Sequence, residues 1–372
     1  MGKRTRNFLG AFSDGAILFP LLSTLSVGSS FSSVTLLASA GIAYLWAAWF
    51  FRIPMAVQPL KAVAIAAVVS GASFSEVRFA GGVVGVFCLT LAFVDVLGNL
   101  DRYIERIPRV LVHGVQMGLG VLLILKGLEL FSSWQIVAIA ALLILLGLWI
   151  RDSELPVLGL LATGGLLWTV LSEKTMAPHL LAKEVSVHLV RPQVLLALAL
   201  PQMVLTSANS VIATHDVAHR YFGTRANRVT PKRLLQSIGF GNLISSFVGG
   251  LPFCHGAGGL TAHVRGGASD WSSNVIIGVT LLGLAGIQLL GGQVRLNYPP
   301  VLLSVLLILV GYYHLKLSAP SWAKKTERVK LIAMLIAALA TQNMIWILAA
   351  GILIFGLEIV LRSRQFPWRV LP

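Results

Sequence analysis

Two short segments of this sequence place prolines and polar residues inside long apolar stretches. The first, PMAVQPLK, runs from Pro54 to Lys61, and the second, LPFCHGAGGL, runs from Leu251 to Leu260. Proline disfavours helix in the residue before it and fits the first turn of a new helix. Each segment therefore predicts an extended stretch followed by a helix that begins within the apolar region. The free backbone N–H groups of such a helix start can bind an anion.

Lys61 is the residue of the first segment that most needs a partner. An ammonium in a membrane interior costs roughly 2.5–3.5 kcal/mol, so it requires a negative partner or a water-filled cavity. Asp14, in the sequence GAFSDG, is one candidate partner, and a bound anion is the other. Gln58 is expected at or near the N-cap of the new helix, beside Lys61. A structural Lys61–Asp14 pair and an anion site both remain open at this stage.

The second segment offers small residues and one histidine. Gly256 and Gly258 let the backbone approach a ligand or a neighbouring helix closely. His255 can donate a hydrogen bond or take a proton near neutral pH, although a histidine that only packs is equally compatible with the pattern. Cys254 stands beside it, but no other Cys or His has the spacing of a metal site, so we expect neither a metal nor a cofactor.

A later apolar block, PQMVLTSANSVIATHD, carries four neutral hydrogen-bonding residues: Thr206, Ser207, Asn209 and Ser210. When the two halves of the chain are aligned, Asn209 takes the place that Asp14 holds in the first half. Neutral donors suit a ligand that is already negative, because a carboxylate would repel it. The alternative is that these side chains hydrogen-bond between helices.

The composition is that of a membrane protein with several helical spans. Of the 372 residues, 56% are hydrophobic and 12% are charged, against about 25% charged in ordinary soluble domains. The net charge of +15 is spread over short clusters between apolar blocks, which does not favour nucleic-acid binding. Cys88 and Cys254 predict no disulfide framework. Neither a phosphate-binding loop nor a nucleophile–base motif is present, so an ATP-driven pump and an enzyme are both disfavoured.

The expected fold is an all-α polytopic membrane protein with fourteen membrane elements, of which the third and tenth are broken helices. Most of the 29 Lys and Arg residues fall in loops on one side, which places both termini in the cytoplasm of a multi-pass protein of the cell (inner) membrane. The expected spans are 8–27, 31–51, 53–71, 79–98, 110–130, 134–150, 155–172, 193–214, 234–249, 251–264, 272–294, 296–318, 329–343 and 345–361.

The two Pro-containing segments also predict an internal repeat. IPMAVQP, from Ile53, can be laid on LPFCHGA, from Leu251, and each opens the third element of a set of seven. An odd number of spans turns the second copy upside down, and paired broken helices point to a transporter's binding site. We expect repeats at 1–172 and 193–372, joined by an extracytoplasmic linker at 173–192. Chance similarity between two Pro-containing loops is the alternative.

Several motifs of this sequence resemble those of a known family. PMAVQPLKAVA, LPFCHGAGGLTAHVRGGA, GAFSDG and SANSVIATHDVAHRYFG resemble the molybdate-transporter family of plants and bacteria, which is similar to the SulP sulfate permeases and, more distantly, to the uracil permeases. The resemblance runs from about residue 8 to at least residue 361. It departs from the family pattern at Ala62 and Val63, where a small polar residue is usual, and in RGGASDW at 265–271.

The resemblance implies a core domain (elements 1–4 and 8–11) and a gate domain (5–7 and 12–14), with substrate held between the third and tenth elements. SulP proteins usually carry a cytoplasmic STAS domain; none is recognised here, so their regulation is not carried over. The expected substrate-binding residues are Gln58, Pro59, Lys61, Asn209, His255, Gly256, Ala257 and Gly258, and Asp14 and His255 are the candidate proton carriers.

These expectations combine into one functional hypothesis. The protein is expected to be a secondary transporter of a tetrahedral oxyanion, first of all molybdate, working by alternating access with a co-transported proton. A sulfate or nucleobase transporter of the same fold is the alternative, and a passive anion channel is a second alternative. The expected partners are the oxyanion, a proton and the lipid bilayer, with a homodimer left open and nucleic acid excluded.

Overall fold

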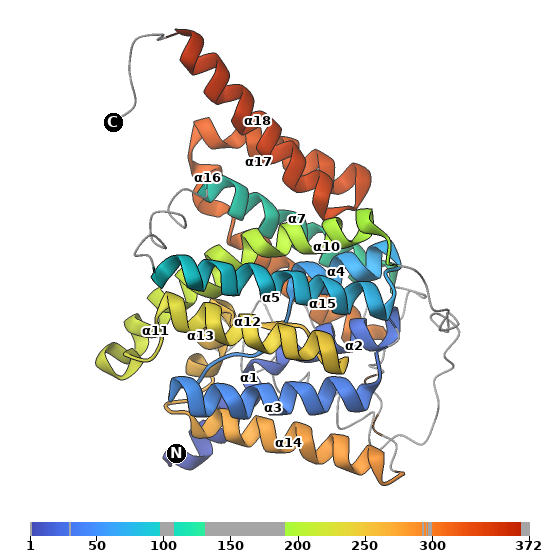
Figure 1. Ribbon diagram of the computed structural model, residues 1–372, viewed down its shortest axis with the longest axis vertical. Helices are drawn as coiled ribbons and strands as arrows, with labels where there is room; N and C mark the ends of the chain where they lie inside the picture. Colours follow the sequence, from blue (N-terminus) through green and yellow to red (C-terminus); the bar gives the residue numbers. More distant parts are fainter. Residues whose placement is uncertain are drawn as a thin grey trace.

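The computed structural model is a bundle of helices that run side by side, with α17 and α18 at one end and α3 and α14 at the other (Figure 1). The structure describes residues 2–29, 31–96, 108–130, 190–291, 294, 296 and 300–365. The elements expected at 134–150 and 155–172, and nearly all of the linker at 173–192, lie outside the described residues.

The first half contains seven described elements. They are α1 (Lys3–Ser13), α2 (Gly15–Gly28), α3 (Ser33–Phe51), β1 (Gln58–Pro59), α4 (Lys61–Ser70), α5 (Phe74–Val96) and α7 (Arg109–Glu129). The predicted break in the third element is confirmed, because the chain is extended before Lys61 and helical from there. The first expected element, 8–27, is corrected: it begins at Lys3 and is divided at Asp14 into α1 and α2.

The second half contains the remaining described elements. They are α10 (Pro192–Leu205), the π-helix η1 (Thr206–Ala213), α11 (Thr214–Phe222), the 3₁₀-helix η2 (Gly223–Ala226), α12 (Pro231–Val248), β2 (Phe253–Cys254), α13 (Ala257–Arg265), α14 (Ser272–Leu289), α15 (Pro300–Lys316), α16 (Ala319–Ala323), α17 (Lys325–Thr341) and α18 (Met344–Gln365). The eighth expected element, 193–214, is longer than predicted, since it continues through η1 and α11 to Phe222. Six helical stretches of the described chain are long and apolar enough to cross a membrane.

Close helix packing follows from glycines at the crossing points. α3 lies along α14, α5 along α12 and α7 along α15. A Cβ atom added to Gly41 of α3 would lie 2.8 Å from the carbonyl oxygen of Gly278 in α14. A Cβ atom added to Gly85 of α5 would lie 3.0 Å from the carbonyl oxygen of Gly239 in α12. Small residues at these crossings allow the backbones to touch, as is common between membrane helices.

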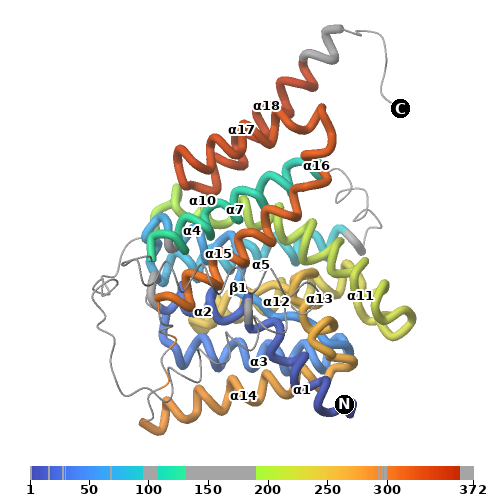
Figure 2. The backbone as a smooth tube through the Cα atoms, turned by 180° about the vertical axis from the view of Figure 1, so that it is seen from behind, coloured from blue at the N-terminus to red at the C-terminus, as the bar shows by residue number. Residues whose placement is uncertain are grey.

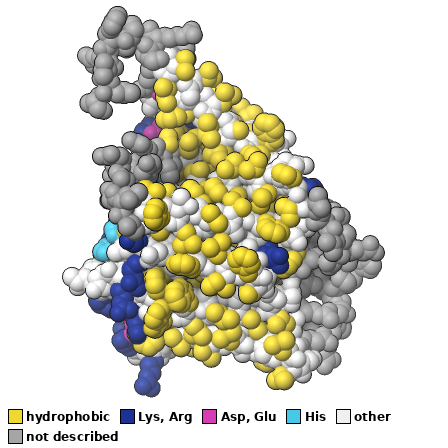
Figure 3. Space-filling view, viewed as in Figure 1, with side chains coloured by type: hydrophobic (Ala, Val, Ile, Leu, Met, Phe, Trp, Pro, Cys, Tyr) yellow, Lys and Arg dark blue, Asp and Glu magenta, His cyan; other side chains and the backbone are white. Residues whose placement is uncertain are grey.

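The outer surface of the bundle is apolar over a wide area. Hydrophobic side chains cover most of the face shown in Figure 3, and Lys and Arg side chains gather along one edge. Large apolar residues on several helices are exposed, among them Trp49 (58%), Phe247 (83%) and Leu353 (62%). Such a surface is stable against lipid tails and not against water.

Candidate substrate site

The two broken elements meet in the middle of the bundle. β1 pairs with β2 in antiparallel register, with Gln58 opposite Cys254 and Pro59 opposite Phe253. The Leu60 N–H donates to the Pro252 carbonyl at 3.0 Å, which extends the pairing toward α4. Figure 2 shows β1 near the centre of the molecule. Because one helix begins directly after each strand, the N-termini of α4 and α13 are brought to the same region.

Two buried asparagines hold the extended backbone in place. The Asn242 side chain of α12 receives the Phe253 N–H at 2.9 Å and donates to the Phe253 carbonyl at 2.7 Å. The Asn274 side chain of α14 receives the Met55 N–H at 2.9 Å and donates to the Met55 carbonyl at 2.7 Å. Irregular backbone at membrane depth is tolerated only when its polar groups are satisfied in this way or line a cavity.

Lys61 is buried, with 4% of its surface exposed. Among the residues that the structure describes, none forms a hydrogen bond or an ion pair with its ammonium group. Asp14, the expected alternative partner, instead accepts hydrogen bonds from the Tyr44 hydroxyl at 2.7 Å and from Gln58 Nε2. The structure therefore does not show the Lys61–Asp14 ion pair that the sequence left open.

Three of the expected side chains surround Gly256. A Cβ atom added to this glycine would lie 2.9 Å from Gln58 Oε1, 3.6 Å from Lys61 Nζ and 3.7 Å from Asn209 Nδ2. Gln58 Oε1 is buried and has no hydrogen-bond partner in the described part of the chain. The residue following Gly256, Ala257, begins α13, and its N–H group has no acceptor within the helix.

Gly258 follows Ala257 in the first turn of α13. It is exposed, and a Cβ atom added to it would meet nothing within 4 Å. Its N–H group also belongs to the first turn of α13 and lacks an acceptor within the helix. The cluster therefore combines a buried lysine, an amide and backbone donors that lack acceptors within the helix, which is an arrangement suited to an anion.

His255 has other partners. Its Nδ1 lies 2.8 Å from the Ala56 carbonyl and its Nε2 lies 2.9 Å from the Ser237 hydroxyl, which also receives the Trp46 indole N–H at 3.0 Å. A carbonyl only accepts, so Nδ1 carries the hydrogen and Nε2 accepts from Ser237. The ring thus joins the two broken elements to α12. The roles of anion ligand and proton carrier that the sequence suggested for His255 stay predictions.

Asn209 is presented by the π-helix η1, which lies between α10 and α11. The Thr214 hydroxyl lies 2.9 Å from the Asn209 carbonyl and 3.2 Å from the His255 carbonyl, and so links the π-turn to the second broken element. π-turns within helices often mark functional sites. Gln202 of α10 accepts the Ala62 N–H at 2.8 Å, which caps the start of α4.

Most of the sequence matches the profile of one protein family. Residues 7–123 and 194–313 match the sequence profile of the molybdate transporter family of the MFS superfamily. The chain belongs to this family. The resemblance drawn from the two Pro-containing motifs is confirmed, and the family is one of transporters rather than enzymes. With its apolar helices, the chain is an integral membrane protein.

Two curated relatives carry the family's name. Molybdate transporter 1 of Chlamydomonas reinhardtii is 30% identical over 128 residues, which are 32% of this chain and 23% of that protein. Molybdate transporter 2 of Arabidopsis thaliana is 30% identical over 159 residues, which are 42% of this chain and 32% of that protein. The matched part is about a third or less of each relative's length.

Solved structures of anion transporters share the fold. The transmembrane domain of a cyanobacterium bicarbonate transporter, BicA, has a TM-score of 0.60 at 16% identity and covers 94% of this chain and 97% of its own. The murine anion transporter Slc26a9 in its inward-facing state has a TM-score of 0.67 at 11% identity and covers 96% and 69%. At these identities the likeness concerns the fold alone.

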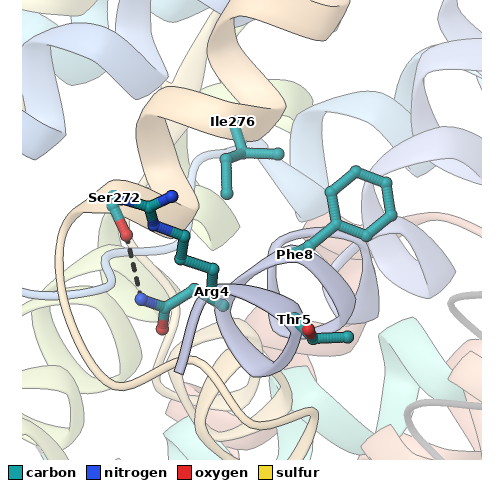
Figure 4. Close-up of a pocket in the computed structure, with 6 residues that line it drawn as sticks. Arg4, Thr5, Phe8, Ser272 and Ile276 are labelled. Atoms are coloured by element: carbon teal, nitrogen blue, oxygen red, sulfur yellow. Dashed lines mark hydrogen bonds between the residues drawn. The ribbon is translucent and has the colours of Figure 1, made fainter. Parts of the chain in front are cut away.

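In this family member, a separate pocket lies outside the central cluster. It has a volume of about 490 Å³ and lies between α1 and the start of α14 (Figure 4). Its lining residues are Arg4, Thr5, Asn7, Phe8, Ser272 and Ile276. None of the expected substrate-binding residues lines it, so the candidate site is defined by the helix N-termini and Lys61 instead.

Proposed function

We propose that the protein is a secondary transporter that carries a tetrahedral oxyanion, with molybdate as its substrate, by alternating access and together with a proton. The observation that carries the proposal is the buried Lys61 ammonium, which has no hydrogen-bond or ion-pair partner among the described residues. An unpaired buried charge is strongly unfavourable, and a bound anion supplies the missing partner.

The surrounding donors suit an oxyanion. Asn209 Nδ2 and Lys61 Nζ both lie close to the position of a Cβ on Gly256, and the first N–H groups of α13 are unused within the helix. The N-terminal end of a helix also carries partial positive charge. A tetrahedral oxyanion can accept hydrogen bonds on each of its oxygens, so it uses donors that converge from both half-helices.

Alternating access is supported by the symmetry of the contacts. The α3–α14 pair corresponds to the α12–α5 pair when the halves are exchanged. The antiparallel pairing of β1 with β2 is compatible with the same two-fold relation. These features favour inverted repeats at 1–172 and 193–372, in which α7, α15, α17 and α18 form a gate that packs beside the core.

The orientation of the protein in the membrane is proposed from basic residues at the end that carries the N-terminus. Arg52 lies over the Trp271 ring, Arg225 donates to the Ser269 carbonyl at 2.7 Å and Lys3 pairs with Asp270 at 2.7 Å. Basic loops are typical of the cytoplasmic side, so this end, with the N-terminus, is assigned to the cytoplasm of the cell membrane. A homodimer stays a prediction.

Uptake into proteoliposomes tests the substrate and the mode of transport. Radioactive molybdate is offered to reconstituted protein with an excess of unlabelled molybdate, sulfate or uracil. We expect saturable uptake of the labelled molybdate, and we expect unlabelled molybdate to inhibit it more strongly than sulfate or uracil does. Uptake that rises linearly with concentration would identify a channel, and stronger competition by sulfate or uracil would reassign the substrate.

A further inference from the structure

A buried acidic network adjoins the anion site. Asp14 is fully buried at the break between α1 and α2. One carboxylate oxygen accepts from Gln58 Nε2 and the other accepts from the Tyr44 hydroxyl at 2.7 Å. His263 of α13 is also fully buried, and its Nε2 lies 3.7 Å from Asp14 Oδ2. The second oxygen of Asp14 therefore faces the imidazole edge.

The tautomer of His263 follows from its other nitrogen. Nδ1 lies 2.8 Å from the Gly10 carbonyl, which can only accept, so Nδ1 carries the hydrogen. The neutral ring then has a lone pair on Nε2, and this atom is buried without a hydrogen-bond partner in the part of the chain that the structure describes. A nitrogen lone pair and a carboxylate oxygen thus face each other away from water, which is unfavourable unless a proton joins them.

We propose that the Asp14–His263 pair is the binding site of the co-transported proton. The inference deepens the transport function proposed above and rests on it. One proton adds to Nε2 or to the carboxylate, which changes the charge of the pair from −1 to 0 and breaks no other bond. The same proton leaves the pair when the site opens to the other side of the membrane.

Gln58 connects the proton site to the anion site. Its Nε2 donates to Asp14, and its unpartnered Oε1 lies beside the position of a Cβ on Gly256, near Lys61 and Asn209. In this orientation the amide oxygen faces an incoming anion and repels it. When the proton is held on Asp14 Oδ1, the oxygen that Gln58 contacts, this hydroxyl can donate to Oε1 of the reversed amide, and Nε2 then donates to the anion.

Proton and anion therefore stabilise each other's binding. The protonated pair carries no net charge near the anion, and the Gln58 amide, reversed when the proton is on Asp14, offers a donor in place of an acceptor. Coupling of two ligands is reciprocal, so the anion must raise the proton affinity of the pair by the same factor. This is the relation that a symporter needs.

Other ionisable groups lie around the pair. The Tyr44 ring stands edge-on to the His263 ring with centroids 6.1 Å apart, and the Lys61 ammonium lies near Gln58 Oε1, within electrostatic reach of Asp14. His255 is fixed by Ala56 and Ser237. The elements α1 and α11, which also pack against α13, carry ionisable side chains that are partly or fully exposed: Lys3, Arg4, Arg6, His215, Asp216, His219, Arg220 and Tyr221.

Titration of molybdate binding at several pH values tests the proposal. The full chain is purified, and its affinity is measured between about pH 6 and pH 8, where histidine titrates. For the wild type we expect the affinity to rise as the pH falls, by up to about tenfold per pH unit for one linked proton. The control His219→Gln, on α11, should show the same curve.

Two substitutions in the pair should both abolish the dependence of affinity on pH. One should leave a high affinity and the other a low affinity. Asp14→Asn imitates the protonated acid, because its amide can donate to Gln58 Oε1, so its affinity should be high and independent of pH. His263→Gln leaves Asp14 without the base that shares the proton, so its affinity should be low and independent of pH. Thermal unfolding of each variant checks that the fold is kept.

The outcomes separate this inference from the proposed function. A wild type that binds molybdate with no dependence on pH overturns the proton site and leaves anion transport standing. An Asp14→Asn or His263→Gln protein that keeps the wild-type slope overturns it as well. A wild type that binds neither molybdate nor sulfate at any pH overturns the proposed function itself.

Discussion

Gln58 of β1 lies opposite Cys254 of β2 in the antiparallel pairing of the two broken elements. Since α4 begins at Lys61 and α13 begins at Ala257, this register sets two helix N-termini beside one another in the middle of the bundle. The partial positive charge of both helix ends and the Lys61 ammonium then act on the same region. The pairing thus depends on the Asn242 and Asn274 side chains, which hold the extended segments in place.

Asn274→Ala should destabilise the protein and weaken anion binding together. The substitution leaves the buried N–H and carbonyl of Met55 without their partner, at a cost of about 2 kcal/mol or more. The melting temperature of the purified protein and its affinity for molybdate measure the two effects. Asn227→Ala, at an exposed position, is the control and should change neither. A stable Asn274→Ala protein with unaltered affinity would show that the brace is dispensable.

Gly41→Ala should loosen the contact between α3 and α14. The new Cβ would lie 2.8 Å from the Gly278 carbonyl oxygen, closer than real contacts allow, and backbone shifts of this kind cost about 1–3 kcal/mol. We expect a lower melting temperature. Gly283→Ala in the same helix pair meets nothing within 4 Å and should be neutral or stabilising. Equal melting temperatures for the two variants would contradict the close crossing.

Asp270, in the loop before α14, should make stability depend on pH. Partial burial raises the pKa of this carboxyl, but hydrogen bonds from Lys3, Ser272 and Asn7 outweigh that effect and lower the pKa below its ordinary value. A lowered pKa in the folded state contributes stability above the unfolded pKa of about 4, and this contribution is lost as the pH falls toward the folded value.

Melting curves of the Asp270→Asn variant at several pH values test whether Asp270 stabilises the protein at neutral pH and not in acid. The variant should melt below the wild type at neutral pH, and the difference should shrink as the pH falls below about 4. Asp216→Asn, at a mostly exposed carboxylate, is the control for lost surface charge. A difference that is constant with pH would show that the ionised form of Asp270 contributes nothing.

The sequence predicted much of the helical architecture because its signals are local. Long apolar blocks mark the spans, and Pro54 and Pro59 mark the break before α4. The N-terminal element was predicted as one span from residue 8, whereas the helix starts at Lys3 and divides at Asp14. Apolar length does not reveal such a division, because helices on both sides have similar composition.

The surroundings of the site were harder to predict. Asn242, Asn274, Tyr44 and His263 were not singled out, although each contacts the extended segments or Asp14. Their partners lie far away in the sequence, as the 219 positions between Met55 and Asn274 illustrate. A polar residue in an apolar block indicates that it has a hydrogen-bond partner, but the sequence does not identify that partner. The presence of a polar residue at each of these positions was the available signal.

Lys61→Met tests the central claim most directly. Molybdate binding to the purified variant is titrated next to the wild type and next to Lys316→Met, whose lysine is exposed. Because Lys61 supplies the buried positive charge, the variant should bind at least about 100-fold more weakly, while Lys316→Met should match the wild type. An affinity of the folded Lys61→Met protein within about threefold of the wild type would contradict the assignment of Lys61 as the counter-ion of the transported anion.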